Sequence, residues 1–188
     1  MGYATGHPVR LYGGRLALDF VNTADWSSDG AIVHEKLTCL ADLEVWAAAA
    51  GLDGALPVQD IAELQAFRLA LRGLFLGQGA GTTLNALRHV AFATAQGASL
   101  IQGQSVTGLI ALSAAAILTD GREHSRIKRC PGDNCGWLFV DETRNARRTW
   151  CSMQSCGNRA KAARHYARHK AAARRSAGPD GSSVSVVE

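Results

Sequence analysis

The 188-residue chain has no long apolar run. Gly, Gln, Asp or Arg interrupts each apolar stretch well before the run of about 18 apolar residues that a membrane-spanning helix needs. The N-terminal segment Met1 to Arg10 also lacks the basic-then-apolar order of a secretion signal. We therefore expect a cytoplasmic protein with no membrane partner.

The sequence also lacks complete catalytic motifs. His34-Glu35 begins an H-E-x-x-H zinc-protease pattern, but Thr38 stands where the second histidine is needed. The glycine-rich segment 77–81 has no P-loop lysine and follows an expected helix, not a strand. The C-terminal histidines lie among arginines, with no carboxylate pair for acid–base chemistry. We therefore expect the protein not to be an enzyme.

Hydrophobic residues make up 47% of the chain, which is enough for a packed core. The charge, in contrast, is unevenly distributed. Residues 1–121 have six Lys/Arg against ten Asp/Glu, a net of −4, whereas residues 122–175 have fourteen against four, a net of +10. Such segregation indicates a polyanionic partner, most often nucleic acid, for the C-terminal segment.

The apolar pattern predicts a mainly helical α+β fold. Strand-forming runs at 9–12 and 15–21 flank Gly13-Gly14, which favours a β-hairpin there. Apolar residues recur at helical spacing in four further segments, which are 40–50, 61–75, 82–91 and 106–119. The composition predicts a helical domain at 1–121, a small basic module at 122–175 and, because Gly, Ser, Pro and Asp dominate it, a disordered tail at 176–188.

Four of the five cysteines lie in the basic module, with the spacing C-x4-C, fifteen residues, C-x4-C. Two short pairs separated by a loop are typical of a structural zinc site. Two disulfides are the alternative, and the absence of a secretion signal disfavours them because cytosolic thiols stay reduced. We therefore expect one structural Zn²⁺ held by Cys130, Cys135, Cys151 and Cys156.

Within this module, residues 137–140 are expected to form a strand, 141–145 a turn and 147–150 a returning strand or short helix. Ala-, Arg- and Lys-rich residues 158–170 then form a helix, so that the module is treble-clef-like. A module of this size cannot fold on its apolar core alone, so zinc binding supplies much of its folding free energy.

The segment from Cys151 to Ala162, which includes Cys156-Gly157-Asn158-Arg159, resembles the signature of the CGNR zinc-finger family. The approach Arg147-Arg148-Thr149-Trp150 also fits that pattern, although Thr149 departs from it. Residues 14–23 and 43–46 resemble the ABATE domain that usually precedes this finger. The resemblance implies a bacterial, stress-related transcription regulator whose finger binds DNA.

Lys161, Arg164 and Arg168 share one face of the expected C-terminal helix, with His165 beside them. Alanines 160, 163 and 167 form a second face, which we expect to rest on the finger core. Long cations suit phosphate contacts, and arginine can also bind guanine. The candidate nucleic-acid-binding residues are Arg144, Arg147, Arg148, Arg159, Lys161, Arg164, His165, Arg168 and Lys170.

Polar residues near the end of the first apolar run either cap the turn that follows or point into a ligand pocket. Two arginines of the 61–75 helix either contact an anionic ligand there or pair with Asp19. The candidate pocket residues are Asp19, Asn22, Thr23, Arg68 and Arg72. The sequence thus predicts a DNA-binding transcription regulator whose N-terminal domain senses a small molecule or forms a homodimer. The alternative is a zinc-stabilised module that binds RNA or protein and has no sensing role.

Overall fold

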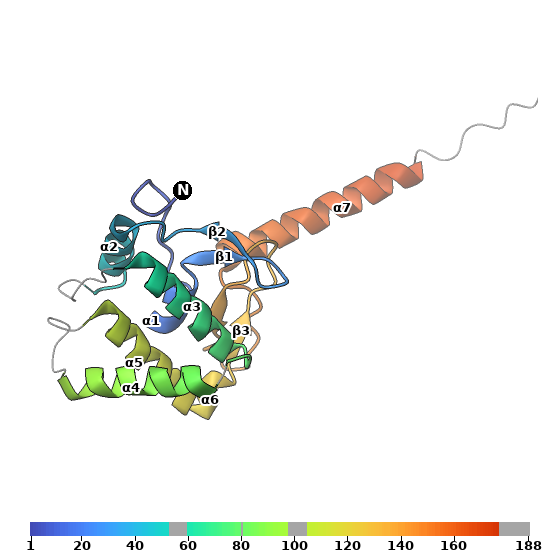
Figure 1. Cartoon of the computed structure of the whole chain (residues 1–188). Coiled ribbons are helices and arrows are strands. Elements are labelled where there is room, and N and C mark those ends of the chain that lie inside the picture. Colours follow the sequence, from blue (N-terminus) through green and yellow to red (C-terminus); the bar gives the residue numbers. More distant parts are fainter. Residues whose placement is uncertain (53–59, 80, 98–104, 177–188) are drawn as a thin grey trace, which may run out of the picture.

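The computed structural model describes residues 1–52, 60–79, 81–97 and 105–176 (Figure 1). Helices predominate, and two small antiparallel hairpins accompany them. The predicted disordered tail lies almost wholly outside the described residues, and helix α7 extends to Ser176.

The first predicted hairpin is wrong, because residues 16–21 form a helix, α1 (Leu16–Val21). An apolar run of this length does not distinguish strand from helix. The amides of Leu18 and Asp19 donate to the Arg15 carbonyl at 3.0 and 2.9 Å, which closes a helical turn. Five of the six residues are buried, so α1 lies inside the core, where a helix can be apolar on all sides.

A hairpin does follow directly, between β1 (Ala24–Trp26) and β2 (Ile32–Glu35). Ala24 pairs with Glu35 and Asp25 with His34, and the register then shifts so that Trp26 pairs with Ile32. The Ser27 amide donates to the Ala31 carbonyl at 2.9 Å and closes the connecting turn.

The other predicted helices are present. They are α2 (Leu40–Ala49), α3 (Ile61–Phe75), α4 (Gly81–Gly97) and α5 (Val106–Thr119), followed by the short α6 (Gly121–His124). Asp60 accepts from the Ala62 amide at the start of α3, and Ser105 accepts from the Gly108 amide at the start of α5. α1 packs against α3 and α5, and these helices contribute many of the side chains of the larger hydrophobic core.

The hairpin of the C-terminal module differs from the predicted one. β4 (Leu138–Val140) pairs with the upstream strand β3 (Ile127–Arg129), and described residues 141–152 contain no strand. Cys130 and Cys135 lie in the turn between the two strands. β4 thus pairs with the strand that precedes it in the sequence. The amide of Cys130 donates to the carbonyl of Trp137 at 2.8 Å and closes the base of the turn between the two strands.

β4 joins two hydrophobic cores. Leu138 and Val140 belong to the core formed mainly by α1, α3 and α5, whereas Phe139 belongs to a second core that contains the four cysteines, Ala24 and Trp26. Successive side chains of a strand point to opposite faces, so one short strand serves both cores. The C-terminal module therefore packs on the N-terminal domain through apolar residues of both.

Helix α7 (Asn158–Ser176) projects away from the rest of the molecule (Figure 1). Its contacts are chiefly with the preceding π-helical turn η1 (Met153–Gly157). Ala163 and Ala167 are exposed and Ala160 is half-buried. The expectation that the alanine face rests on the finger core is therefore wrong, because α7 leaves that core after its first turn.

Candidate metal centre and basic surface

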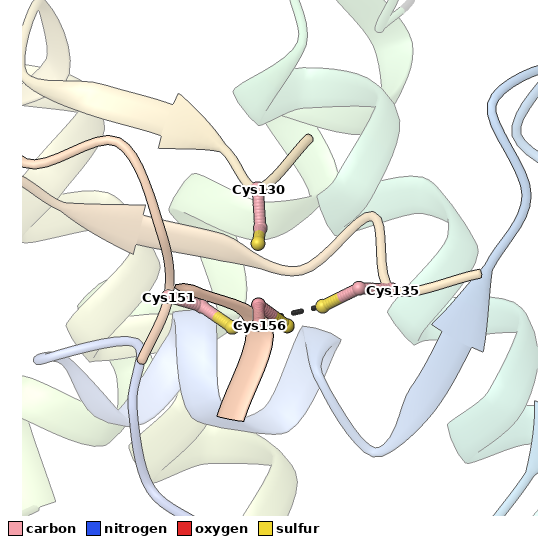
Figure 2. Close-up of side chains that lie close together, drawn as sticks. All are labelled: Cys130, Cys135, Cys151 and Cys156. Carbon is pink, nitrogen blue, oxygen red and sulfur yellow. Dashed lines mark hydrogen bonds between the residues drawn. The ribbon is translucent and has the colours of Figure 1, made fainter. Parts of the chain in front are cut away.

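The four cysteines of the C-terminal module converge on one point, as Figure 2 shows. Cys130 follows β3, Cys135 lies in the turn before β4, Cys151 lies near the end of the irregular segment 141–152 and Cys156 belongs to η1. All four Sγ atoms lie within 4.8 Å of one another. The four side chains are buried, with 2 to 5% of their surface exposed. Sequence positions up to 26 residues apart thus supply one donor set.

The donor set fits a zinc ion. Four sulfurs at the usual Zn–S distance of about 2.3 Å form a tetrahedron with edges of about 3.8 Å. Cys135 and Cys151 Sγ lie 3.6 Å apart, and Cys151 and Cys156 Sγ lie 3.7 Å apart. None of the four is in a disulfide. Four thiolates complete the tetrahedral coordination, so the zinc is structural and offers no position for a substrate.

The four cysteine thiols need a bound metal ion in order to be deprotonated together. Hydrogen bonding with Cys130 and Cys135, together with burial, raises the pKa of the Cys151 thiol. A second thiolate beside an existing one is unfavourable in the absence of a cation. Zinc supplies two positive charges and holds coordinating thiols in the deprotonated form. Metal binding and folding of this module are therefore coupled.

Arg159 lies at the metal centre. Its Nη2 donates to Cys156 Sγ at 3.4 Å, and this hydrogen bond raises the pKa of the guanidinium. A cation at this position partly neutralises a thiolate cluster that keeps a net negative charge after zinc binds. The guanidinium predicted to contact nucleic acid thus contacts a zinc ligand.

Arg148 is also held by the protein. Its guanidinium donates to the carbonyls of Tyr12, Val140, Trp150 and Cys151 and lies over the Phe139 ring, 4.4 Å from its centre. These contacts connect the irregular segment 141–152 to β4 and to the N-terminal segment. Arg148 therefore fastens the module to the rest of the chain.

Asp141 organises the same segment and was not singled out from the sequence. The buried carboxylate accepts from Lys128 Nζ at 2.6 Å, from the Thr143 hydroxyl at 2.5 Å and from the Arg148 amide at 2.8 Å. Burial alone raises a carboxyl pKa, but the hydrogen bonds from Lys128, Thr143 and Arg148 outweigh it and leave the pKa of Asp141 well below its usual range. In the sequence, this position is marked by the end of an apolar run and the start of the expected turn 141–145, and neither feature predicts the role of the carboxylate.

The remaining predicted nucleic-acid-binding residues form the basic surface, which we define as Arg144, Arg147, Lys161, Arg164, His165, Arg168 and Lys170. All seven residues are exposed. Arg144 and Arg147 line a hollow of about 700 Å³ that Met153 of η1 borders. Lys161, Arg164, His165 and Arg168 line a second hollow along α7.

The predicted pocket residues lie in the interior. The Asp19 carboxylate accepts from the amide of the preceding Gly13 at 2.7 Å. The Asn22 side chain donates to the Leu138 carbonyl and accepts from the Leu138 amide, both at 2.8 Å. Asn22 thereby occupies the edge of β4 that β3 leaves open. The Thr23 hydroxyl donates to the Phe20 carbonyl at 2.7 Å.

The two arginines of α3 complete this interior network. Arg68 forms a two-pronged ion pair with Glu35 and donates to Thr23 Oγ1 at 3.0 Å. Arg68 therefore does not pair with Asp19. Arg72 donates to the Gly136 carbonyl at 2.9 Å and lies 4.1 Å from the centre of the Trp26 ring. Each of the five predicted pocket residues has at least one partner within the protein, but Arg68 Nε and Arg72 Nη2 are buried without a hydrogen-bond partner among the described residues.

Trp26 is the central side chain that sequence reasoning missed. Its backbone amide donates to the Cys135 carbonyl at 3.1 Å, and its ring packs in the core that contains the four cysteines. Trp137 of the finger reaches back and donates to Asp25 Oδ1 at 2.8 Å. No sequence signal places Trp26 at the finger, because the contact spans more than 100 residues.

These features define a class of protein, a helical domain whose core continues into a four-cysteine zinc finger with a projecting basic helix. Comparison with family models identifies both parts. Residues 14–121 match ABATE, described as "Putative stress-induced transcription regulator", and residues 126–169 match the CGNR zinc finger. The chain belongs to the ABATE family and carries a CGNR zinc finger at its C-terminal side, as the sequence motifs predict.

No curated protein matches the chain. Neither family description names an enzymatic activity. Among the described residues, no helix combines the length and apolar character needed to cross a membrane.

Proposed function

We propose that the protein is a DNA-binding transcription regulator and that α7, presented by the zinc finger, is its principal DNA-binding element. The observation that carries the proposal is the exposed and projecting position of α7 (Figure 1). The family description of a transcription regulator and the zinc finger support the same function.

The charge of α7 supports a polyanionic partner. Seven Lys/Arg and no Asp/Glu lie between Asn158 and Ser176. No carboxylate of α7 itself can offset the mutual repulsion of these cations, so a nucleic acid backbone would stabilise the helix. Nineteen helical residues span about 28 Å, and the major groove admits an α-helix.

The exposed cations divide into two groups. Lys161, Arg164 and Arg168 lie on one face of α7 and are placed to contact base edges or adjacent phosphates. Arg144 and Arg147 lie in the irregular segment before η1, which suits contacts with the flanking backbone. Arg148 and Arg159 act indirectly in this proposal, because they hold the segment and the metal centre.

The N-terminal domain remains the proposed sensing or dimerisation domain. A single finger offers a short half-site, and dimers gain affinity by binding two such half-sites. Light scattering at rising protein concentration, with and without DNA, tests the dimer. A mass that stays monomeric under both conditions contradicts it.

The test of DNA binding compares two triple variants of equal charge in the zinc-loaded, full-length protein. One is Lys161→Ala/Arg164→Ala/Arg168→Ala. The matched control, Arg10→Ala/Arg88→Ala/Arg122→Ala, removes three exposed cations elsewhere. Fluorescence anisotropy measures binding to duplex DNA, single-stranded RNA and heparin across a salt series.

We expect the α7 variant to lose DNA affinity and to lower the slope of log affinity against log salt by about 1 for each contact removed. The control variant should retain the parent's slope. Equal behaviour of the two variants, or binding to DNA no tighter than to heparin, contradicts the proposal. A preference for single-stranded RNA would instead support the alternative of an RNA-binding module.

A further inference from the structure

We propose that His165 and His169 of α7 form a second metal site, a surface chelate for a divalent first-row transition metal such as Ni²⁺ or Zn²⁺. The two histidines lie one helical turn apart, and both are exposed. Their Nε2 atoms approach to 3.1 Å, and their ring centres are 4.3 Å apart. This site is separate from the zinc centre, because both histidines lie on α7, which begins after Cys156 and projects away from the rest of the molecule (Figure 1).

The separation of the two nitrogens fits one metal ion. At a metal–nitrogen distance of 2.0 to 2.1 Å and ligand angles of 90 to 109°, two imidazole nitrogens lie about 2.8 to 3.4 Å apart. The observed separation of 3.1 Å falls within this range. Without a metal, one neutral ring donates its Nε2–H to the Nε2 of the other ring; when a metal ion binds both Nε2 atoms, the donating ring instead carries its proton on Nδ1.

The side chains around the pair determine the class of metal. Imidazole ligands suit Zn, Ni and Cu, whereas Ca²⁺ and Mg²⁺ require oxygen ligands. α7 contains no Asp or Glu, so its own carboxylates cannot complete the coordination. Water, or a nitrogen or oxygen donor of a bound nucleic acid, would fill the remaining positions. Lys161 and Arg168 lie near the pair on α7 and weaken cation binding, so this site binds metal less tightly than the four cysteines do.

The experiment titrates the full-length, zinc-loaded protein with NiCl₂ by isothermal calorimetry, after chelating resin has removed loosely bound metal. Elemental analysis after the titration verifies that the cysteine-bound zinc remains in place. The test variant is His169→Ala. A matched control, His169→Ala/Ala172→His, restores the number of histidines but places the second ring two turns from His165, about 10 Å along the helix.

We expect the parent protein to bind one nickel ion at this site. Both variants should bind it on the order of 100-fold more weakly, because a second ligand on the same helix acts at high effective concentration. Nickel should also slow hydrogen exchange of the α7 amides in the parent and not in the variants. Equal nickel affinity in the parent and the two-turn variant, or no binding by the parent, overturns the proposal.

Discussion

The link between the helical domain and the finger depends strongly on one buried amide, that of Asn22. Its side chain makes both hydrogen bonds that the outer edge of Leu138 offers, each 2.8 Å long. Both residues are almost wholly buried, with 1% and 0% of their surface exposed. Asn22→Ala removes both bonds and leaves the Leu138 amide and carbonyl buried without a partner.

The cost follows from the desolvation of these two groups. An unsatisfied buried donor or acceptor costs about 1 to 3 kcal/mol, so two of them cost about 2 to 6 kcal/mol. Entry of water into the space left by the side chain lowers this cost, which places our expectation in the lower half of the range. That loss is a large fraction of the 5 to 15 kcal/mol typical of a folded domain.

Urea unfolding of the zinc-loaded protein, followed by far-ultraviolet circular dichroism, measures this loss. The matched control is Asn145→Ala, which truncates an exposed asparagine of the irregular segment. We expect the control to unfold within about 0.5 kcal/mol of the parent, as surface substitutions usually do. The reasoning is refuted if Asn22→Ala also stays within that margin, because Leu138 would then not need its side-chain partner.

Three further predictions concern the same junction. Zinc removal by a chelator should shift tryptophan fluorescence to longer wavelengths, because Trp26 shares a core with the cysteines; an unchanged spectrum contradicts this coupling. Gly136→Ala should lower the urea midpoint, because its φ is +55° and an added Cβ would lie 2.7 Å from the Trp26 Cβ; an unchanged midpoint excludes the clash. The parent should be more stable than Asp141→Asn at neutral pH, and this difference should shrink as the pH falls below about 4. The sign follows from the depressed pKa of Asp141, whose charged form stabilises the fold and is lost on protonation; a difference independent of pH between 3 and 7 contradicts it.

The sequence alone determined much of the metal centre. Cysteine has few roles at C-x4-C spacing, and two matched pairs are enough to predict a four-thiolate zinc site that the structure then brings together. The helices at 61–75 and 106–119 were predictable for a similar reason, since their apolar periodicity extends over several turns. The excess of cations after residue 121 likewise located the exposed basic surface, and the polyanionic partner that it predicts is part of the proposed function.

Only the tertiary structure decided how the remaining residues are used. Five of the residues 16–21 are apolar and only Asp19 is charged, so their pattern does not separate a buried helix from a strand, and packing between α3 and α5 selects the helix. In the sequence, Arg148 and Arg159 look no different from Arg144 and Arg147, since all four are arginines of the basic module. In the structure, Arg148 is held by backbone carbonyls and Arg159 by a zinc ligand.

The contacts between the helical domain and the zinc finger could not be predicted from the sequence, for a physical reason. Asn22 and Leu138, or Trp26 and Cys135, come together over separations of more than 100 residues, and no local propensity encodes such contacts. Sequence periodicity indicates which face of a helix or strand is buried, but it does not indicate which other element packs against that face. The zinc site was thus determined by local spacing, whereas its attachment to the helical domain was determined by the packing of β4 between two cores.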